Sequence, residues 1–300
     1  MTSPRPPLAE LPAGAPARLA VGAVEAGSLS LGAFQRARSC LSPEGLGGRA
    51  LSRRRSGGPT LVLAPGSVRV QLALSSPSAL VPDADVPRLL NRHVRPLLRA
   101  LTKLGALPRY GGRDFVSAGS HVVAWVGFAH HQGSGAALFE ALVAVEEALV
   151  LPASLDGYPH RREPPYMGKK AGSLRDVTAR SRSSAEVVAA IEAAYRSAYG
   201  ELPALALPGD VAVEDEAPFV ALEEEAIGFV GATGDALGGD MMASEDLIAA
   251  LSARLPMLPR GASEEDVRRE LGRAAEEVPG FVEGIRDLGA IARVVARAIA

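Results

Sequence analysis

Hydrophobic residues in this chain change from a two-residue period to a helical period, and this change strongly limits the possible folds. Val68, Val70 and Leu72 point to one side of a predicted strand, and the polar residues between them point to the other. From 85 to 104 the apolar positions follow helical spacing instead. Further strands are predicted in 18–31, 60–63, 113–117 and 121–128, and a second helix in 183–199. The order of strands, helix, strands, helix and a helical tail predicts an α+β fold.

Changes in composition divide the chain into four parts. Residues 1–17 are rich in proline and alanine and are expected to be disordered, whereas 18–200 hold the strands and long helices. An acidic, proline-containing connector is expected over 201–235. A small helical accessory domain is expected over 236–300. Its helices are predicted at 245–255, 264–278 and 280–299, the first two capped by Ser244 and Ser263.

Charge and cysteine content exclude several classes of protein. The net charge of −2 predicts no general affinity for nucleic acid or for an anionic membrane. Cys40 is the only cysteine, so an internal disulfide and a cysteine-based zinc cluster are excluded. The first residues lack the order of a signal peptide, and no apolar run is long enough to span a membrane. A cytoplasmic protein is therefore expected.

Five short segments occur in the order and spacing found in lipoate–protein ligases. They are 28–35 (SLSLGAFQ), 53–58 (RRRSGG), 111–115 (GGRDF), the pair at 130–131 (HH) and 172–180 (GSLRDVTAR). The chain thus resembles the biotin–lipoate cofactor transferase family. This resemblance implies a mixed sheet flanked by helices. It also implies a strand over 137–143, although the stretch from 136 to 150 has helical propensity.

The resemblance also implies a chemistry and a set of site residues. Such proteins use ATP, with Mg²⁺, and lipoate or octanoate to form an acyl adenylate, and then acylate a lysine on a lipoyl-carrier domain. Arg54 can pair with a phosphate or carboxylate, and the following serine and glycines can bring hydroxyl and N–H groups to the adenylate. The positions that match the family's binding residues are Arg54, Ser56, Gly57, Gly58, Asp114 and His131.

One position departs from this pattern in a way that bears on catalysis. Where the family has its catalytic lysine, this chain has His121, and its only lysines are Lys103, Lys169 and Lys170. Loss of one preorganised charge of this kind costs about 10²–10³ in rate. Histidine could replace the charge only when protonated, near or below about pH 6.5. Binding by the loop with loss of turnover is therefore expected.

Three functions agree with these features. The first is an active or impaired ligase, for which another group in space could replace the lysine. The second is a non-catalytic relative that binds an acyl chain, a nucleotide or a carrier domain. The third is a thiol acyltransferase that uses Cys40, which could equally be a small buried apolar residue. In the first two, 53–58 and His121 are expected to line one cleft.

Overall fold

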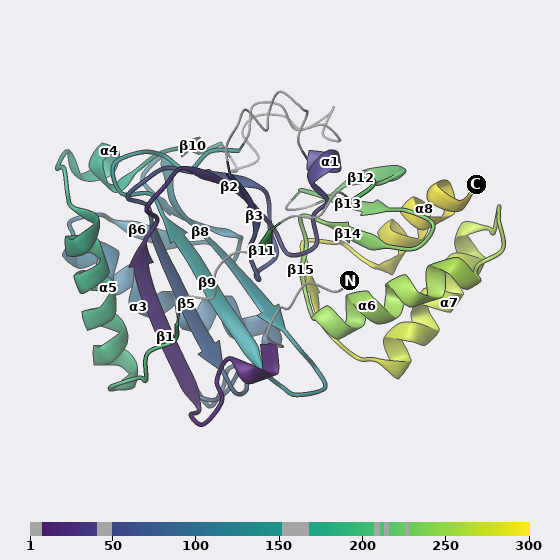
Figure 1. Ribbon diagram of the computed structural model, residues 1–300, viewed down its shortest axis with the longest axis horizontal. Coiled ribbons are helices and arrows are strands. Elements are labelled where there is room, and N and C mark those ends of the chain that lie inside the picture. Colours follow the sequence, from purple (N-terminus) through teal and green to yellow (C-terminus); the bar gives the residue numbers. More distant parts are fainter. Residues whose placement is uncertain (1–7, 41–49, 152–167, 207–210, 213–215, 226–227) are drawn as a thin grey trace.

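The computed structural model describes residues 8–40, 50–151, 168–206, 211–212, 216–225 and 228–300 (Figure 1). It has a large sheet with helices on one face and, beside it, a smaller C-terminal unit. The α+β class and the mixed sheet flanked by helices are confirmed. No helix in these ranges is both long and apolar enough to cross a membrane.

The main sheet has seven strands and is almost entirely antiparallel. Its order is β1-β5-β9-β8-β7-β6, and β10 pairs in parallel with β8. The bounds are β1 Ala17–Ala23, β5 Val68–Leu74, β6 Pro108–Tyr110, β7 Phe115–Ala118, β8 His121–His130, β9 Ala137–Val143 and β10 Lys170–Ala171. The strand expected over 137–143 is thus confirmed. β9 pairs with β5 on one edge and with β8 on the other, and all seven of its residues are buried, which outweighs its helical propensity.

Two long helices cover one face of this sheet. They are α3 (Leu89–Lys103), preceded by the 3₁₀ turn η2 (Val86–Arg88), and α5 (Ser184–Tyr199). Ser183 and Glu186 form the capping box that the sequence predicts for α5. The short α4 (Leu174–Thr178) begins at Ser173 with a second capping box. Apolar side chains of α3 and α5 pack on β5, β8 and β9 to form the main core.

A small second sheet covers part of the opposite face. Its order is β11-β3-β2-β4, with bounds β2 Ser28–Leu31, β3 Ala50–Arg53, β4 Leu61–Leu63 and β11 Val211–Ala212. Leu61 and Leu63 of β4 are buried against Trp125 and Leu142 of the main sheet. A short helix, α1 (Ala37–Cys40), follows β2. The main sheet is therefore sandwiched between helices and a small sheet.

The N-terminal segment is more ordered than its composition predicts, as far as the described residues extend. Leu8–Glu10 form a 3₁₀ turn, η1, and Leu8 and Leu11 are buried. They pack with Ala73, Ala129 and Leu138 on the main sheet. The expectation of disorder is thus wrong for residues 8–17, because two leucines bury their side chains there. Residues 1–7 lie outside the described ranges.

The C-terminal unit is helical, as expected, but it also contains strands. Its helices are α6 Glu245–Arg254, with the 3₁₀ turn η3 (Leu255–Met257), α7 Glu264–Glu277 and α8 Leu288–Ile299. Its strands are β12 Ala221–Glu225, β13 Gly228–Ala232, β14 Leu237–Gly239, β15 Met242–Ala243 and β16 Val282–Glu283. β12 and β13 lie within the segment expected to be a connector, and α8 packs on them. The last helix begins at 288 rather than 280.

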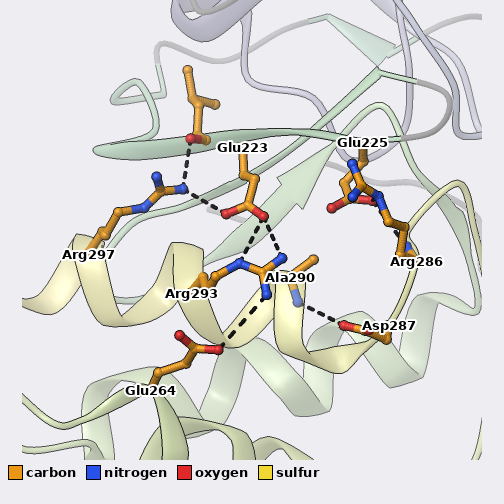
Figure 2. Close-up of polar contacts among 9 residues, drawn as sticks. Glu223, Glu225, Glu264, Arg286, Asp287, Ala290, Arg293 and Arg297 are labelled. Atoms are coloured by element: carbon orange, nitrogen blue, oxygen red, sulfur yellow. Dashed lines mark hydrogen bonds and ion pairs between the residues drawn. The ribbon is translucent and has the colours of Figure 1, made fainter.

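A network of ion pairs joins the last helix to the sheet of this unit (Figure 2). Glu223 on β12 accepts hydrogen bonds from Arg293 at 2.6 Å and from Arg297 at 3.1 Å. Arg297 also donates to the carbonyl of Leu222 at 2.9 Å. Because one carboxylate holds two arginines one turn apart on α8, the register of the helix on the strand is fixed.

We expect Glu223→Ala to lower the melting temperature by about 2 °C, because it leaves both arginines without their shared partner. The measurement is thermal unfolding followed by circular dichroism. Glu277→Ala, which removes the exposed pair with Arg254, is the matched control and should have a smaller effect. Equal effects of the two variants would contradict a special role for Glu223.

Candidate functional site

A β-bulge in β8 decides which side chains face the glycine-containing loop at 54–58. Val116 pairs with Ala124 and Ser117 pairs with Val122, so Val123 is the extra residue. Val122 and Trp125 consequently face the small sheet, where they contact Leu61. This is the face on which the loop lies.

The guanidinium of Arg54 binds carbonyl groups of its own chain. It donates to Ser30 at 2.8 Å, to Gly57 at 3.1 Å and to Pro59 at 2.7 Å. Arg54 is 4% exposed. In this arrangement the arginine fixes the shape of the loop, which differs from the phosphate-binding role expected from the sequence.

Ser56 contacts a carboxylate that the sequence analysis did not select. Its hydroxyl donates to Glu140 at 2.6 Å, and its N–H donates to the same oxygen at 3.2 Å. Glu140 also accepts a hydrogen bond from Gln71 Nε2 at 3.0 Å and lies 3.7 Å from Arg69 Nε. A single charged residue in an otherwise apolar strand (ALFEALV) is the signal that could have revealed Glu140.

The two loop glycines are packed against the C-terminal unit. The N–H of Gly57 donates to Phe128 and that of Gly58 donates to Met241, both at 3.2 Å. A Cβ atom on Gly57 would lie 2.1 Å from the carbonyl oxygen of Met241. The N–H groups expected to meet an adenylate are thus bonded within the chain.

Further contacts join the C-terminal unit to this loop. Gln35 donates through Nε2 to Asp240 at 2.5 Å, and its Oε1 accepts from the hydroxyl of Thr60 at 2.7 Å. Burial lowers the pKa of Arg55, while Glu245 on α6 and Glu140 in the sheet oppose that shift. The loop therefore lies between the main sheet and α6, as a joint between the two units.

The cavity next to the loop is small. It has a volume of about 10 Å³ and is lined by Arg54, Ser56, Trp125 and Glu140 among others. A volume of this size holds about one water molecule, whereas pockets for small organic ligands measure about 300–1,000 Å³. As the described residues form it, this cavity is too small for an acyl chain or an adenylate.

His121 does not lie beside this loop. It pairs with Ala118, which belongs to the helix-covered core, and its ring contacts Gly172 and interacts with Asp176 of α4. Gly127, which contacts Ser56, is six residues further along β8, a distance of about 20 Å. The expectation that 53–58 and His121 line one cleft is therefore wrong, because the bulge turns His121 to the other face. Its register neighbour Lys170 lies on that face too.

The other two expected site residues do not line the loop cavity. Asp114 is buried next to Tyr110, whose pKa is raised by burial and then by Glu283 and Asp114. His131 forms a turn in which its Nδ1 accepts from the N–H of Ser134 at 3.1 Å. The neighbouring backbone N–H groups of this turn donate to Asp246 on α6.

His130 and Cys40 are both buried. His130 Nδ1 lies 2.8 Å from the hydroxyl of Ser244, and burial lowers its pKa. Ser244 stands before α6 without making a side-chain capping bond. Cys40 is fully buried with Leu29, Leu31 and Phe229, so it behaves as a small apolar residue in this structure and has no surface for acyl transfer.

Comparison with known proteins supports the fold that the resemblance implies. The sequence matches no family model and no curated protein. Among solved structures, P. falciparum LipL1 in complex with lipoate aligns over 94% of this chain and 87% of its own, with TM-score 0.62 and 11% identity. A bi-partite lipoate protein ligase from Thermoplasma acidophilum, studied with its E2 lipoyl domain, aligns over 64% and 74%, with TM-score 0.52 and 19% identity.

A third structure, lipoate-protein ligase A bound with ATP, aligns over 66% of this chain and 81% of its own, with TM-score 0.51 and 18% identity. These likenesses define the class of fold. The chain has the fold of lipoate–protein ligases, and the resemblance inferred from its sequence is confirmed at that level.

The residues around the loop do not fit an acyl adenylate in this arrangement. The donors that the sequence analysis expected for such a ligand are the N–H groups of Gly57 and Gly58 and the hydroxyl of Ser56, and each already has an acceptor in the chain. In the described ranges, no three histidine, cysteine or carboxylate side chains gather closely enough to hold a metal ion such as Mg²⁺.

Proposed function

We propose that this chain is a lipoate–protein-ligase-like protein in which formation of an acyl adenylate is weak or absent. The proposal rests on one observation. The loop over 54–58 donates its hydrogen bonds within its own chain, to Glu140, Phe128 and Met241. Rate enhancement requires donors that are free to meet the developing charge. Because the donors of this loop are already hydrogen-bonded within the chain, the loop offers little stabilisation to the charge that develops in the transition state.

The proposed role is binding rather than turnover, with a lipoyl-carrier domain as the partner in the cytoplasm. The fold supports this, since two of the solved structures that it resembles are described with lipoate or with a lipoyl domain. The small loop cavity argues against a nucleotide or an acyl chain as the resident ligand of that site. Lipoate, octanoate and ATP remain the substrates to be tested.

The test is incubation of the protein with ATP, Mg²⁺, octanoate or lipoate and a lipoyl-carrier domain, read by mass spectrometry of the carrier. We expect acylation at least about 10²-fold slower than that by an active lipoate–protein ligase assayed in parallel. Binding of the carrier is measured separately by titration calorimetry. Efficient acylation at pH 8 would contradict the proposal, and so would the absence of carrier binding.

We expect His121→Lys to leave carrier acylation unchanged. The new ammonium group would project toward α4, on the face of the sheet opposite to Ser56, and could not reach a phosphate held by the loop. The measurement is the same mass-spectrometric assay, with Lys170→Ala as the control on the adjacent strand. A rise in acylation by His121→Lys of about tenfold or more would show that the catalytic centre is at His121.

A further inference from the structure

A buried carboxylate in the middle of the main sheet is the feature that the fold alone does not explain. Glu140 is 1% exposed, and its strand neighbours Phe139 and Ala141 belong to the main core. Across the sheet it pairs with Gln71 on one side and with Gly127 on the other. Burial of an ionised carboxylate is costly unless its oxygens accept several hydrogen bonds, so its surroundings must be built to hold it.

Both oxygens of Glu140 are held. Oε2 accepts two hydrogen bonds from Ser56, one from the hydroxyl and one from the backbone N–H. Oε1 accepts from Gln71 and lies near the guanidinium of Arg69. Arg55, the residue before Ser56, adds a further electrostatic attraction to Glu140. A hydroxyl, a backbone N–H, a side-chain amide and a guanidinium are groups that proteins use to bind carboxylates and phosphates.

The sheet is shaped so that the loop can approach Glu140. A Cβ atom on Gly127 would lie 3.1 Å from Cβ of Ser56 and 2.9 Å from the carbonyl oxygen of Gly57. Any larger residue at 127 would push the loop away from the strand and lengthen the bonds between Ser56 and Glu140. Gly127, which pairs with Glu140 across the sheet, therefore leaves the space in which the loop donors of Ser56 reach the carboxylate.

We infer that Ser56, Gln71 and Arg69 form an oxyanion site and that the carboxylate of Glu140 is its permanent internal ligand. The ligand class of the site is a small carboxylate or a phosphate, and an external anion enters only when the Glu140 side chain is removed. The inference rests on the proposed function and deepens it, because it names the residue that occupies the two donors of Ser56 in the loop.

The test is anion rescue of Glu140→Ala. The variant leaves space for formate beside Ser56, so formate should raise its melting temperature by several degrees, and by more than sodium chloride at equal ionic strength. Inorganic phosphate and ATP are assayed in the same way to separate carboxylate from phosphate binding. The wild-type protein should gain no more from formate than from sodium chloride.

Two control variants identify the site. Glu147→Ala removes an exposed carboxylate four residues beyond the strand end and should behave as the wild type does. Adding Ser56→Ala to Glu140→Ala removes the hydroxyl donor and should abolish most of the rescue. Equal stabilisation of Glu140→Ala by formate and chloride, or saturable ATP binding by the wild type that Ser56→Ala abolishes, would overturn the inference.

A second variant keeps the inference testable if Glu140→Ala does not fold in buffer. Glu140→Gln keeps the volume and one carbonyl acceptor but removes the charge, so we expect a lower melting temperature that formate does not restore. Wild-type stability of Glu140→Gln would overturn the inference. These results are independent of carrier acylation by the wild type, so failure of the anion site and failure of the proposed function are distinguishable.

Discussion

Gly57→Ala is expected to destabilise the protein by about 3 kcal/mol and to loosen the C-terminal unit from the main sheet. A Cβ atom at this position would lie 2.1 Å from the carbonyl oxygen of Met241 and 2.7 Å from Cα of Met242. Both are backbone atoms, so no side-chain rotation relieves the overlap. The hydrogen bond from Gly58 to Met241 would be lost when the two segments separate.

The measurements are urea unfolding and amide hydrogen exchange of α6. Gly272→Ala is the matched control, because Gly272 lies within α7 and a Cβ atom there would meet nothing within 4 Å. That control should stabilise the protein by up to about 1 kcal/mol, since alanine favours helix over glycine. If Gly57→Ala is as stable as the wild type, the loop is not a tight joint between the units.

Acid is expected to destabilise the pair of helices on the main sheet through His93. Its side chain is fully buried between α3 and α5, with Nδ1 3.1 Å from the hydroxyl of Tyr199 and Nε2 3.3 Å from the carbonyl of Pro77. Arg95 and Arg99 lie near Tyr199 and add positive charge to this region. Burial lowers the pKa of His93 from 6.5 to about 4.

The sign of the effect follows from these two pKa values. The unfolded chain takes up the proton as the pH falls below 6.5, whereas the folded chain resists it down to about 4. The contribution of neutral His93 is thus complete above pH 6.5 and is lost progressively as the pH falls toward 4. A shift from 6.5 to about 4 corresponds to about 3 kcal/mol.

The measurement is the free energy of unfolding at pH 7.5 and at pH 4.5, for the wild type and for His93→Gln. The variant cannot titrate at this position, so its loss of stability in acid should be about 2–3 kcal/mol smaller than that of the wild type. Carboxyl groups that titrate between pH 7.5 and pH 4.5 affect the wild type and the variant equally. An identical loss of stability in the two proteins would exclude His93 as the acid-sensitive group.

Local pattern was sufficient for most elements of the main domain. The alternation at 68–74, the helical spacing from 85 to 104 and the capping box at Ser183 each predict an element that the structure contains. Pattern failed where burial depended on distant partners. Leu8 and Leu11 are held by strands far along the chain, and β12 pairs with β13 and packs against α8, which lies more than 60 residues later.

By itself, the sequence determined the class of fold. Periodicity and caps depend on neighbouring residues, and the order of the five motifs is read directly along the chain. The tertiary structure decided the arrangement of the site. One extra residue at Val123 places His121 and Ser56 on opposite faces of the sheet, since successive strand residues alternate sides. Glu140 and Met241 occupy the donors of the loop although they lie more than 80 residues away in sequence. The order of motifs along the chain does not indicate such long-range contacts. The candidate residues could therefore be named from the sequence, but their hydrogen-bond partners could not.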